Sequence, residues 1–300
     1  MPHASTKSAK MVRRTRPQAW PHVHERTDMA SDQTSPTAQP PTWNASILKD
    51  VAILRELVSK DFKLKYRRSA LGIAWSVLNP LLMMAVQAVV FTQMMRVTDD
   101  TIPNFPIYLI LGNTAFSMMS DATSQGMRSI IGAASLLKKV KINRYVFPIQ
   151  KVLFAGVNYC FSMIAVFLVM AFYGWGPSIH MLWFPVYALL FLAFCSGLSL
   201  ALSALSVFFR DVIHLWGVVL TAWTYMTPLF YSVNILPEWL RSLERFNPMY
   251  LFVTFARRMM LWQAEPGAGV VLGCLACAVV SLAVGILVFR KAEKKFILYI

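Results

Sequence analysis

Between Arg68 and Arg96 the chain carries no Asp, Glu, Lys or Arg, and this gap constrains the fold more than any other feature. The uncharged run is longer than the ~20 residues that a helix needs to span a hydrocarbon core. The segment before it, Leu57–Arg68, mixes five basic residues with leucines and aromatics. This mixture is typical of a helix that lies among lipid headgroups. We therefore predict that a first transmembrane helix starts here, with its basic end at the cytoplasmic face.

Composition places the whole chain in the same class. Of its 300 residues, 57% are hydrophobic and only 14% are charged, whereas soluble domains contain roughly 25% charged residues. The sequence therefore predicts an all-α, polytopic membrane protein. The net charge of +15 would suggest nucleic acid in a soluble chain, but its distribution favours orientation in a membrane instead, and we expect no nucleic-acid partner.

Apolar runs predict six transmembrane helices, which together make a domain over residues 69–300. Their expected spans are residues 72–95, 105–126, 148–172, 181–209, 212–231 and 267–289. The third and fourth spans lie in a 58-residue stretch, 152–209, without any Asp, Glu, Lys or Arg. An even number of spans puts both chain ends on one side of the membrane.

The basic residues indicate which side that is. If the amino end is cytoplasmic, 24 of the 29 Lys and Arg residues fall in inner segments. Basic residues close to span ends are retained on the cytoplasmic side. We therefore expect a multi-pass protein of the inner, cytoplasmic membrane with both termini in the cytoplasm.

Two regions precede the first span. Residues 1–43 are rich in Pro, Ser, Thr, Gln and His and lack apolar periodicity, which predicts a disordered cytoplasmic tail. Over residues 44–68, apolar positions recur every three or four residues and predict an amphipathic helix. Because this helix runs directly into a span, we favour a position in the membrane interface over packing on a cytoplasmic partner.

Two connections are too long to be simple turns. The inner loop 129–146 predicts a short helix over Ile130–Leu137, followed by a basic run. This loop suits docking in a groove of another protein, and it also suits simple anchoring by positive charge. The outer segment 232–264 is divided by Pro237 and Pro248 into two pieces too short to cross a bilayer, so we expect a re-entrant hairpin.

The sequence offers no catalytic or metal site. It contains no G-x-x-x-x-G-K-[ST] phosphate loop, so it is not expected to bind a nucleotide in that way. Asp121 is the only carboxylate within an expected span. Acids inside membranes are costly, which makes this residue a functional candidate. The interpretations are structural pairing, with Arg128 two turns on, or contact with lipid headgroups, and direct contact with a substrate.

Four sequence segments carry a family resemblance. They are KYRRSALGIAWSVLNPLL within Leu57–Leu82, LLKKVKINRYVFP in the inner loop, Arg210-Asp211 before the fifth span, and RFNPMY at Arg245–Tyr250. With these the chain resembles, from about Ile47 to its carboxyl end, the ABC-2 type permeases that export lipid-linked polysaccharides such as O antigens and teichoic acids.

The resemblance implies a homodimer that works with two copies of a separate ABC ATPase subunit, which would bind the ATP and Mg²⁺. It also implies that the inner loop acts as a coupling helix against this ATPase and that the outer hairpin acts as a lid. The coupling residues would be Ser129, Ile130, Leu136, Leu137, Lys138, Lys139 and Lys141.

Two expected helix faces combine aromatic and amide side chains in the way that a sugar path requires. The first span contributes Trp75, Asn79, Met83 and Gln87, and the fifth contributes Trp216, Trp223, Thr227 and Tyr231. We hypothesise that these faces line the path, and helix packing is the alternative for each residue. Arg67 and Arg68 are expected to contact the diphosphate of an undecaprenyl-type lipid carrier at the inner entrance.

Other functions share parts of this pattern. An ABC-2 exporter of a small drug or lipid has the same six-helix plan. A membrane enzyme that acts on a polyprenyl carrier would carry clustered inner acids, whereas this chain has basic residues there. A scaffold protein would have no evident use for the long outer segment.

Overall fold

The computed structural model describes residues 43–67, 71–94, 101–139 and 142–299. The tail expected over residues 1–43 therefore lies outside it except for Trp43, as do Arg68 and Lys141. Every regular element in the described residues is helical, in agreement with the predicted fold class. The α-helices are α1 (Trp43–Tyr66), α2 (Ala74–Ala88), α3 (Phe105–Gly132), α4 (Ala134–Leu137), α5 (Val146–Phe172), α6 (Phe184–Phe208), α7 (Val212–Met226), α8 (Glu238–Glu244), α9 (Pro248–Met260), α10 (Ala268–Glu293) and α11 (Phe296–Tyr299). A π-helical stretch η1 (Val89–Met94) extends α2, and the 3₁₀ turns η2 (Ile179–Trp183) and η3 (Val233–Ile235) precede α6 and α8.

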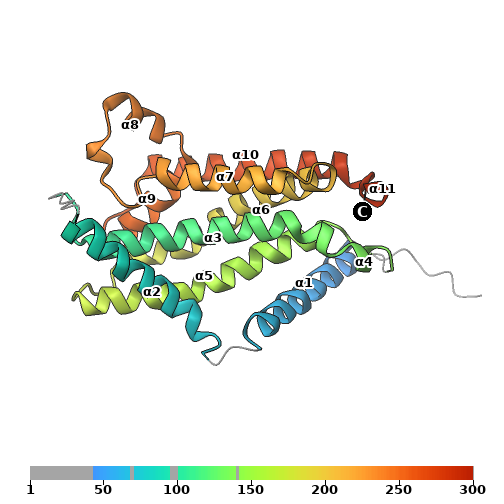
Figure 1. Ribbon diagram of the computed structural model, residues 1–300, viewed down its shortest axis with the longest axis horizontal. Coiled ribbons are helices and arrows are strands. Elements are labelled where there is room, and N and C mark those ends of the chain that lie inside the picture. The colour runs from blue at the N-terminus through green and yellow to red at the C-terminus, as the bar shows by residue number, and fades with distance from the viewer. Residues whose placement is uncertain (1–42, 68–70, 95–100, 140–141, 300) are drawn as a thin grey trace, which may run out of the picture. The chain divides into compact units, whose positions relative to one another are not determined.

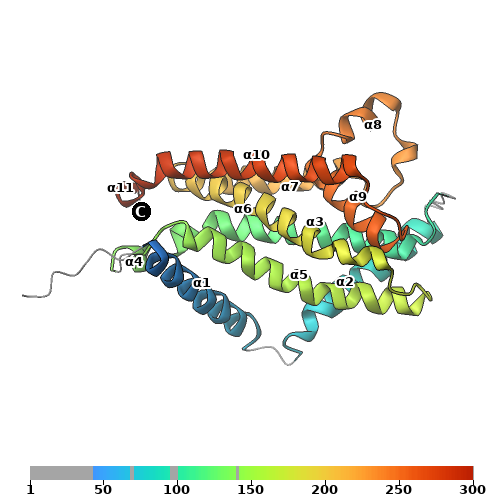
Figure 2. The same cartoon turned by 180° about the vertical axis from the view of Figure 1, so that it is seen from behind.

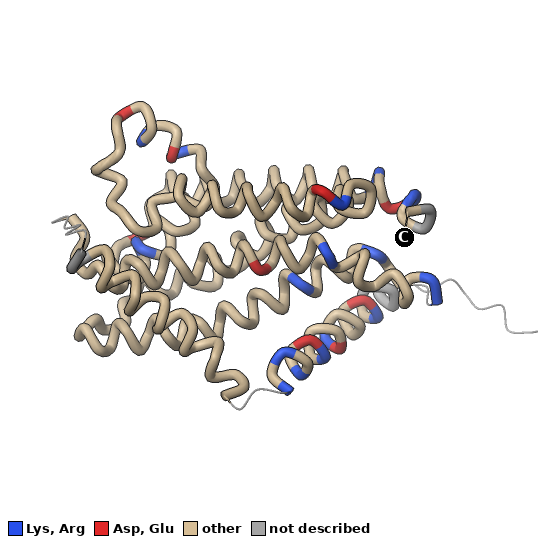
Figure 3. The backbone as a smooth tube through the Cα atoms, viewed as in Figure 1, with Lys and Arg blue, Asp and Glu red and all other residues tan. Residues whose placement is uncertain are grey.

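The long helices α3, α5, α6, α7 and α10 run along a common direction, and α1 and α2 cross them obliquely (Figures 1 and 2). One end of this bundle carries α4, α11 and the start of α1, and the other carries α8 and α9. Lys and Arg residues concentrate near α1, α4 and α11, while charged residues are rare in the middle of the bundle (Figure 3). We call the end with α4 and α11 the basic end.

Among the described residues, four helical segments are long and apolar enough to cross a membrane. They are Ala74–Phe91, Val146–Phe172, Ile179–Phe208 and Ala268–Glu293. Helix α3 has 28 residues, but polar side chains make it less apolar than these four. The six-span count therefore stays a prediction.

Helix α7 is shorter than the expected span 212–231, because it ends at Met226. Thr227 adopts an extended conformation with φ −79° and ψ 132°. The ring of Pro228 disfavours helical geometry in the residue before it, which explains the end at this position. With 15 residues, α7 covers about 22 Å at 1.5 Å per residue.

The inner loop also differs from expectation. Instead of one helix over Ile130–Leu137, α3 continues to Gly132 and a separate turn of helix, α4, follows. Ala133, between them, has φ −96° and ψ 7°, outside helical geometry. Glycine is a poor helix former, so Gly132 favours a break at this point.

Small residues allow α6 and α10 to pack closely. A Cβ atom on Gly285 would collide with the backbone of Gly197, and one on Gly197 would collide with the backbone of Ser281. The Ser281 hydroxyl donates a hydrogen bond to the carbonyl of Phe194 at 2.8 Å. Close backbone approach through small residues is the usual way in which helices associate within a membrane.

Candidate functional site

A polar cleft lies between α2, α3 and α5, with a volume of about 320 Å³. Helix α2 contributes the face that the sequence singled out, and α3 and α5 contribute hydroxyl, amide and carboxylate groups. The polar and aromatic lining consists of Lys65, Trp75, Ser76, Asn79, Gln87, Asn113, Thr114, Ser117, Asp121, Asn158 and Ser162, together with Met83 and Pro80. The expected path residues of the first span, Trp75, Asn79, Met83 and Gln87, therefore meet in one cleft.

Helix α3 carries a polar stripe, which we define as Asn113, Ser117, Asp121, Gln125 and Arg128; the first three line the cleft, and Gln125 and Arg128 line a neighbouring cavity. Their intervals of four, four, four and three residues place them on one helix face. Ser117, Asp121 and Arg128 are exposed, and Asn113 and Gln125 are half-buried. Of these five residues, only Asp121 was considered as a substrate contact from the sequence. The regular spacing of polar residues in an otherwise apolar segment is the signal that identifies the others.

The amides in the cleft are held by neighbouring side chains. Asn113 donates a hydrogen bond to Gln87 and so connects α3 to α2. Lys65 and the Tyr66 hydroxyl both donate to Asn158, at 3.0 and 2.9 Å. These bonds satisfy polar groups that would be costly to leave unpaired in apolar surroundings, and they fix the side chains in defined orientations.

Asp121 differs from the amides. It has no hydrogen-bond or salt-bridge partner in the described part of the chain, and Arg128, the partner considered from the sequence, lines a different cavity. Its carboxylate lies among the lining residues of the cleft, close to Ser117 on the same helix face. This position suits a group that accepts hydrogen bonds from hydroxyls in the cleft.

The expected path residues of the fifth span lie elsewhere. The indole N–H groups of Trp216 and Trp223 donate to Thr123 at 3.1 Å and to Asn247 at 2.8 Å, so both residues pack towards α3 and the segment before α9. Thr227 and Tyr231 lie beyond the end of α7 and not on its face. Thr227 is fully buried, and the Tyr231 hydroxyl bonds back to the carbonyls of Tyr225 and Met226.

Two carboxylates fasten α1 to the basic end of α5. Asp50 accepts hydrogen bonds from Asn143 at 2.7 Å and from the Tyr145 hydroxyl. Burial and this bond to Asp50 raise the pKa of Tyr145 above its usual value. Asp61 accepts from Gln150 and forms a salt bridge with Lys151. These bonds join α1 to the loop before α5 and to the first turns of α5. Neither carboxylate was identified as a site from the sequence.

The expected coupling residues fall into two groups. Ser129 and Ile130 are buried within the last turns of α3, and Ile130 belongs to an apolar cluster with Phe147 and Phe289. Leu136, Lys138 and Lys139 are exposed on and after α4, and Leu137 is half-buried. A cavity of about 620 Å³ separates α4 from α1 and α5. Only the exposed group is available to a partner protein.

The remaining predicted contact, Arg67, is exposed in the turn after α1. Gly72, before α2, has a φ of +49°, which is strained for residues with a Cβ atom. In the part of the chain that the structure describes, no cluster of three or more His, Cys, Asp or Glu residues is placed to hold a metal ion.

Comparison with known families matches residues 53–261 to the ABC-2 type transporter family. The chain belongs to the ABC-2 type transporters. The matched region extends from α1 to the end of α9 and contains every residue of the polar cleft. The cleft therefore lies within the region that the family match covers, and α10 lies outside that region.

Named relatives of this ABC-2 chain are export permeases. It is 32% identical over 246 residues to the O-antigen export system permease protein RfbA of Myxococcus xanthus, which covers 81% of this chain and 94% of the relative. An RfbA protein of Klebsiella pneumoniae is 28% identical over 73% of this chain and 83% of the relative. The capsule polysaccharide export inner-membrane protein CtrC of Neisseria meningitidis serogroup A is 21% identical over 68% of this chain and 77% of the relative.

Proposed function

We propose that this chain is the membrane permease subunit of an ATP-driven exporter that moves a polysaccharide from the cytoplasmic to the outer face of the inner membrane. The relatives named for O-antigen and capsule polysaccharide export support this cargo class. The cargo is a lipid-linked glycan of the undecaprenyl diphosphate type, for which O antigens and teichoic acids are the models. Arg67 and Arg68 meet its diphosphate at the inner entrance.

The observation that carries the proposal is the polar cleft. A hydrated polymer crosses a bilayer only if polar groups of the protein replace the water that it loses. Polar residues inside a membrane cost free energy, so their presence indicates a transport path. The polar stripe on α3 offers hydroxyl, amide and carboxylate groups. Trp75 opposite it offers an aromatic surface on which the C–H faces of sugars stack.

The motor is a separate subunit in this proposal. The chain lacks a phosphate loop, so two copies of an ABC ATPase bind ATP and Mg²⁺ and dock on the exposed residues of α4. Two copies of the permease pair around the path. The ATPase drives export by binding one conformation of the permease more tightly than the other. A bound partner shifts the equilibrium between two conformations only by the difference in its affinity for them.

Export in cells tests the path directly. Ser117→Trp narrows the cleft between α2 and α3, whereas Ser117→Ala leaves it open. In cells that lack the native gene and express each variant at equal level, surface polymer should fall at least tenfold with Ser117→Trp and remain near wild type with Ser117→Ala. Val284→Trp, on the exposed face of α10, is the control. Wild-type export by Ser117→Trp would contradict the proposed path.

A further inference from the structure

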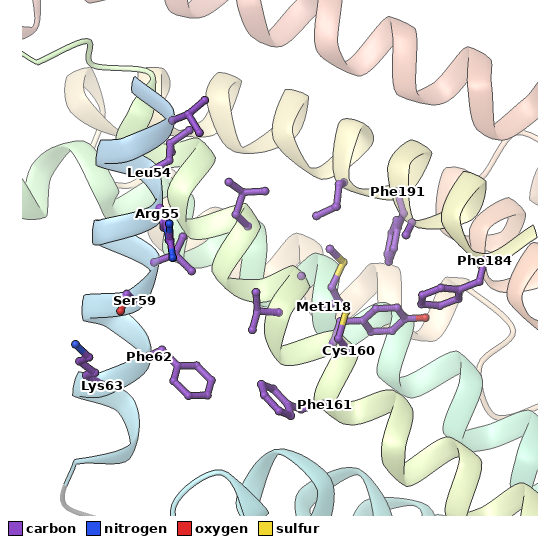
Figure 4. A pocket seen from close by; sticks show the side chains of 18 residues that line it. Leu54, Arg55, Ser59, Phe62, Lys63, Met118, Cys160, Phe161, Phe184 and Phe191 are labelled. Carbon is purple, nitrogen blue, oxygen red and sulfur yellow. The ribbon is translucent and has the colours of Figure 1, made fainter. Parts of the chain in front are cut away.

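A second and larger cavity lies on the other side of α5 from the polar cleft, between α1, α5 and α6. Its volume is about 810 Å³, within the range of cavities that hold small molecules. Its walls are almost entirely hydrocarbon, with Leu153, Val157 and Phe161 from α5 and Phe184, Phe191 and Leu192 from α6. Figure 4 shows Phe161, Phe184 and Phe191 around this space, across from α1. We call it the α1 groove.

Helix α1 keeps the groove open. Polar contacts join it to α5 and to the loop before α5 through Asp50, Asp61 and Lys65, none of which lines the groove. Within the groove lining, the ring centroid of Phe62 lies 5.6 Å from that of Phe161 on α5. These contacts hold α1 beside α5 and leave the space between α1, α5 and α6 open in this structure.

One edge of the groove has a different chemistry. Arg55, Ser59 and Lys63 follow one another at intervals of four on α1, and Figure 4 shows Arg55 on the side of that helix that faces the groove and Lys63 on its outer side. Neither Arg55 nor Lys63 has a hydrogen-bond or salt-bridge partner among the described residues. No Asp or Glu lines the groove. The groove therefore has a long apolar wall. At one edge it has a hydroxyl group and two cationic side chains without a partner among the described residues.

This combination matches a molecule with an aliphatic chain and an anionic phosphate headgroup. Helix α1 starts at the basic end of the bundle (Figure 3), the end that the positive-inside rule assigns to the cytoplasmic leaflet. Anionic phospholipids are a major component of that leaflet, and basic pockets between helices on that side bind their headgroups. The headgroup phosphate would pair with Arg55, Lys63 would add positive charge about two turns further along α1, and an acyl chain would cover Val157, Phe161 and Phe191.

We infer that the α1 groove is a binding site for an anionic phospholipid, separate from the polysaccharide path. The bound lipid fills the space between α1 and the transmembrane helices α5 and α6. The inference does not rest on the identity of the transported cargo.

Photo-crosslinking of the purified full-length protein tests the site. The probes are phosphatidylglycerol and the zwitterionic phosphatidylethanolamine, each with a photoreactive acyl chain, titrated in detergent. Phosphatidylglycerol should bind more tightly and attach to residues 153–161 and 184–192. Arg55→Gln/Lys63→Gln should weaken its binding about 30-fold, the change expected for two cations near a lipid headgroup, and leave phosphatidylethanolamine unchanged.

A matched control removes the same charge from the same helix. Lys49→Gln/Lys60→Gln changes two residues of α1 outside the groove lining and should retain the preference for phosphatidylglycerol. Cys160→Trp fills the groove while it keeps both cations, and it should reduce crosslinking of both lipids. The inference would be overturned if both double variants lost the same amount of phosphatidylglycerol binding. It would also be overturned if the wild type bound the two lipids equally, or if Cys160→Trp left crosslinking unchanged. Displacement of phosphatidylglycerol by an equimolar polyprenyl phosphate would also overturn it, because the occupant would then be a lipid carrier.

Discussion

The guanidinium carbon of Arg257 lies 3.2 Å from the centroid of the Tyr108 ring. Arg257 is fully buried on α9, and it donates to the carbonyls of Tyr108, Pro228 and Leu229 at 2.8 to 3.2 Å. No carboxylate in the described part of the chain contacts it. The carbonyls of Pro228 and Leu229 follow the end of α7, where the backbone has left the helix. Arg257 thus donates hydrogen bonds to buried backbone carbonyls that the end of helix α7 before Pro228 leaves without a helical partner. It also joins α3, α7 and α9 at one point.

Replacing Arg257 should therefore destabilise the outer part of the bundle. Arg257→Lys keeps the charge. However, the compact ammonium group cannot donate to three separate carbonyls as the planar guanidinium group does. We expect a loss of about 2–3 kcal/mol, the cost of leaving buried acceptors unpaired. Thermal unfolding in detergent measures it. Arg258→Lys is the control, since Arg258 is exposed and has one bond, to Pro266. Equal melting temperatures for the two variants would contradict this role.

Gly112 provides the space that Arg257 occupies. A Cβ atom at this position would lie 2.7 Å from a terminal nitrogen of Arg257. Gly112→Ala should cost about 1–3 kcal/mol through overpacking. At Gly217, on α7, a Cβ atom meets nothing within 4 Å, so Gly217→Ala should stabilise by up to about 1 kcal/mol through helix propensity. The two changes are chemically identical, and a similar effect of both on unfolding would disprove the steric account.

The outer segment contains a buried acid whose ionisation opposes folding. Burial raises the pKa of Glu244 above its ordinary value of 4.5, and Asn247 offsets part of this by donating to it at 2.9 Å. The folded protein therefore holds the proton more tightly than the unfolded chain. Stability is lost as the pH rises from 4.5 towards the raised pKa.

Glu244→Gln removes this pH dependence and keeps an acceptor for Asn247. The variant should melt at a higher temperature than the wild type at pH 7, and the difference should shrink as the pH falls to 4.5. Melting curves over this range measure it. A difference that stays constant with pH would show that the ionisation of Glu244 does not affect stability.

The exposed part of α4 is the expected docking point for the ATPase. Leu136→Asp places a charge at an exposed apolar position that the partner would bury. Co-purification of the ATPase should fall at least tenfold while the melting temperature of the permease stays unchanged. Trp239→Asp makes the same kind of change on α8, at the opposite end of the bundle, and should leave co-purification intact. Equal recovery of ATPase with both variants would remove α4 from the interface.

Local sequence patterns predicted much of this molecule because each depends on nearby residues. The charge-free run after Arg68 identified α2, and the spacing of Trp75, Asn79 and Gln87 identified the face that lines the cleft. A proline effect is equally local, and Pro228 explains the early end of α7. The apolar run continues past this proline, so the expected span 212–231 extends beyond the end of the helix at Met226.

Other features depend on partners distant in the chain, and no local pattern contains them. The spacing of Trp216 and Trp223 correctly places them on one helix face, but it does not indicate that this face packs against Thr123 and Asn247. The bond between Asp61 and Lys151 joins residues far apart in the sequence. Arg257 looked like one of several outer basic residues, and only the fold shows that it is buried.

Capture of the polymer during export tests the central claim, that the polar stripe on α3 lines the transport path. A photoreactive phenylalanine analogue is placed at Ser117 in the cleft or at Val284 on the exposed face of α10, and exporting cells are illuminated. The account predicts glycan attached to the protein at position 117 and none at position 284. Export that continues without any adduct at 117, or equal adducts at both positions, would contradict it.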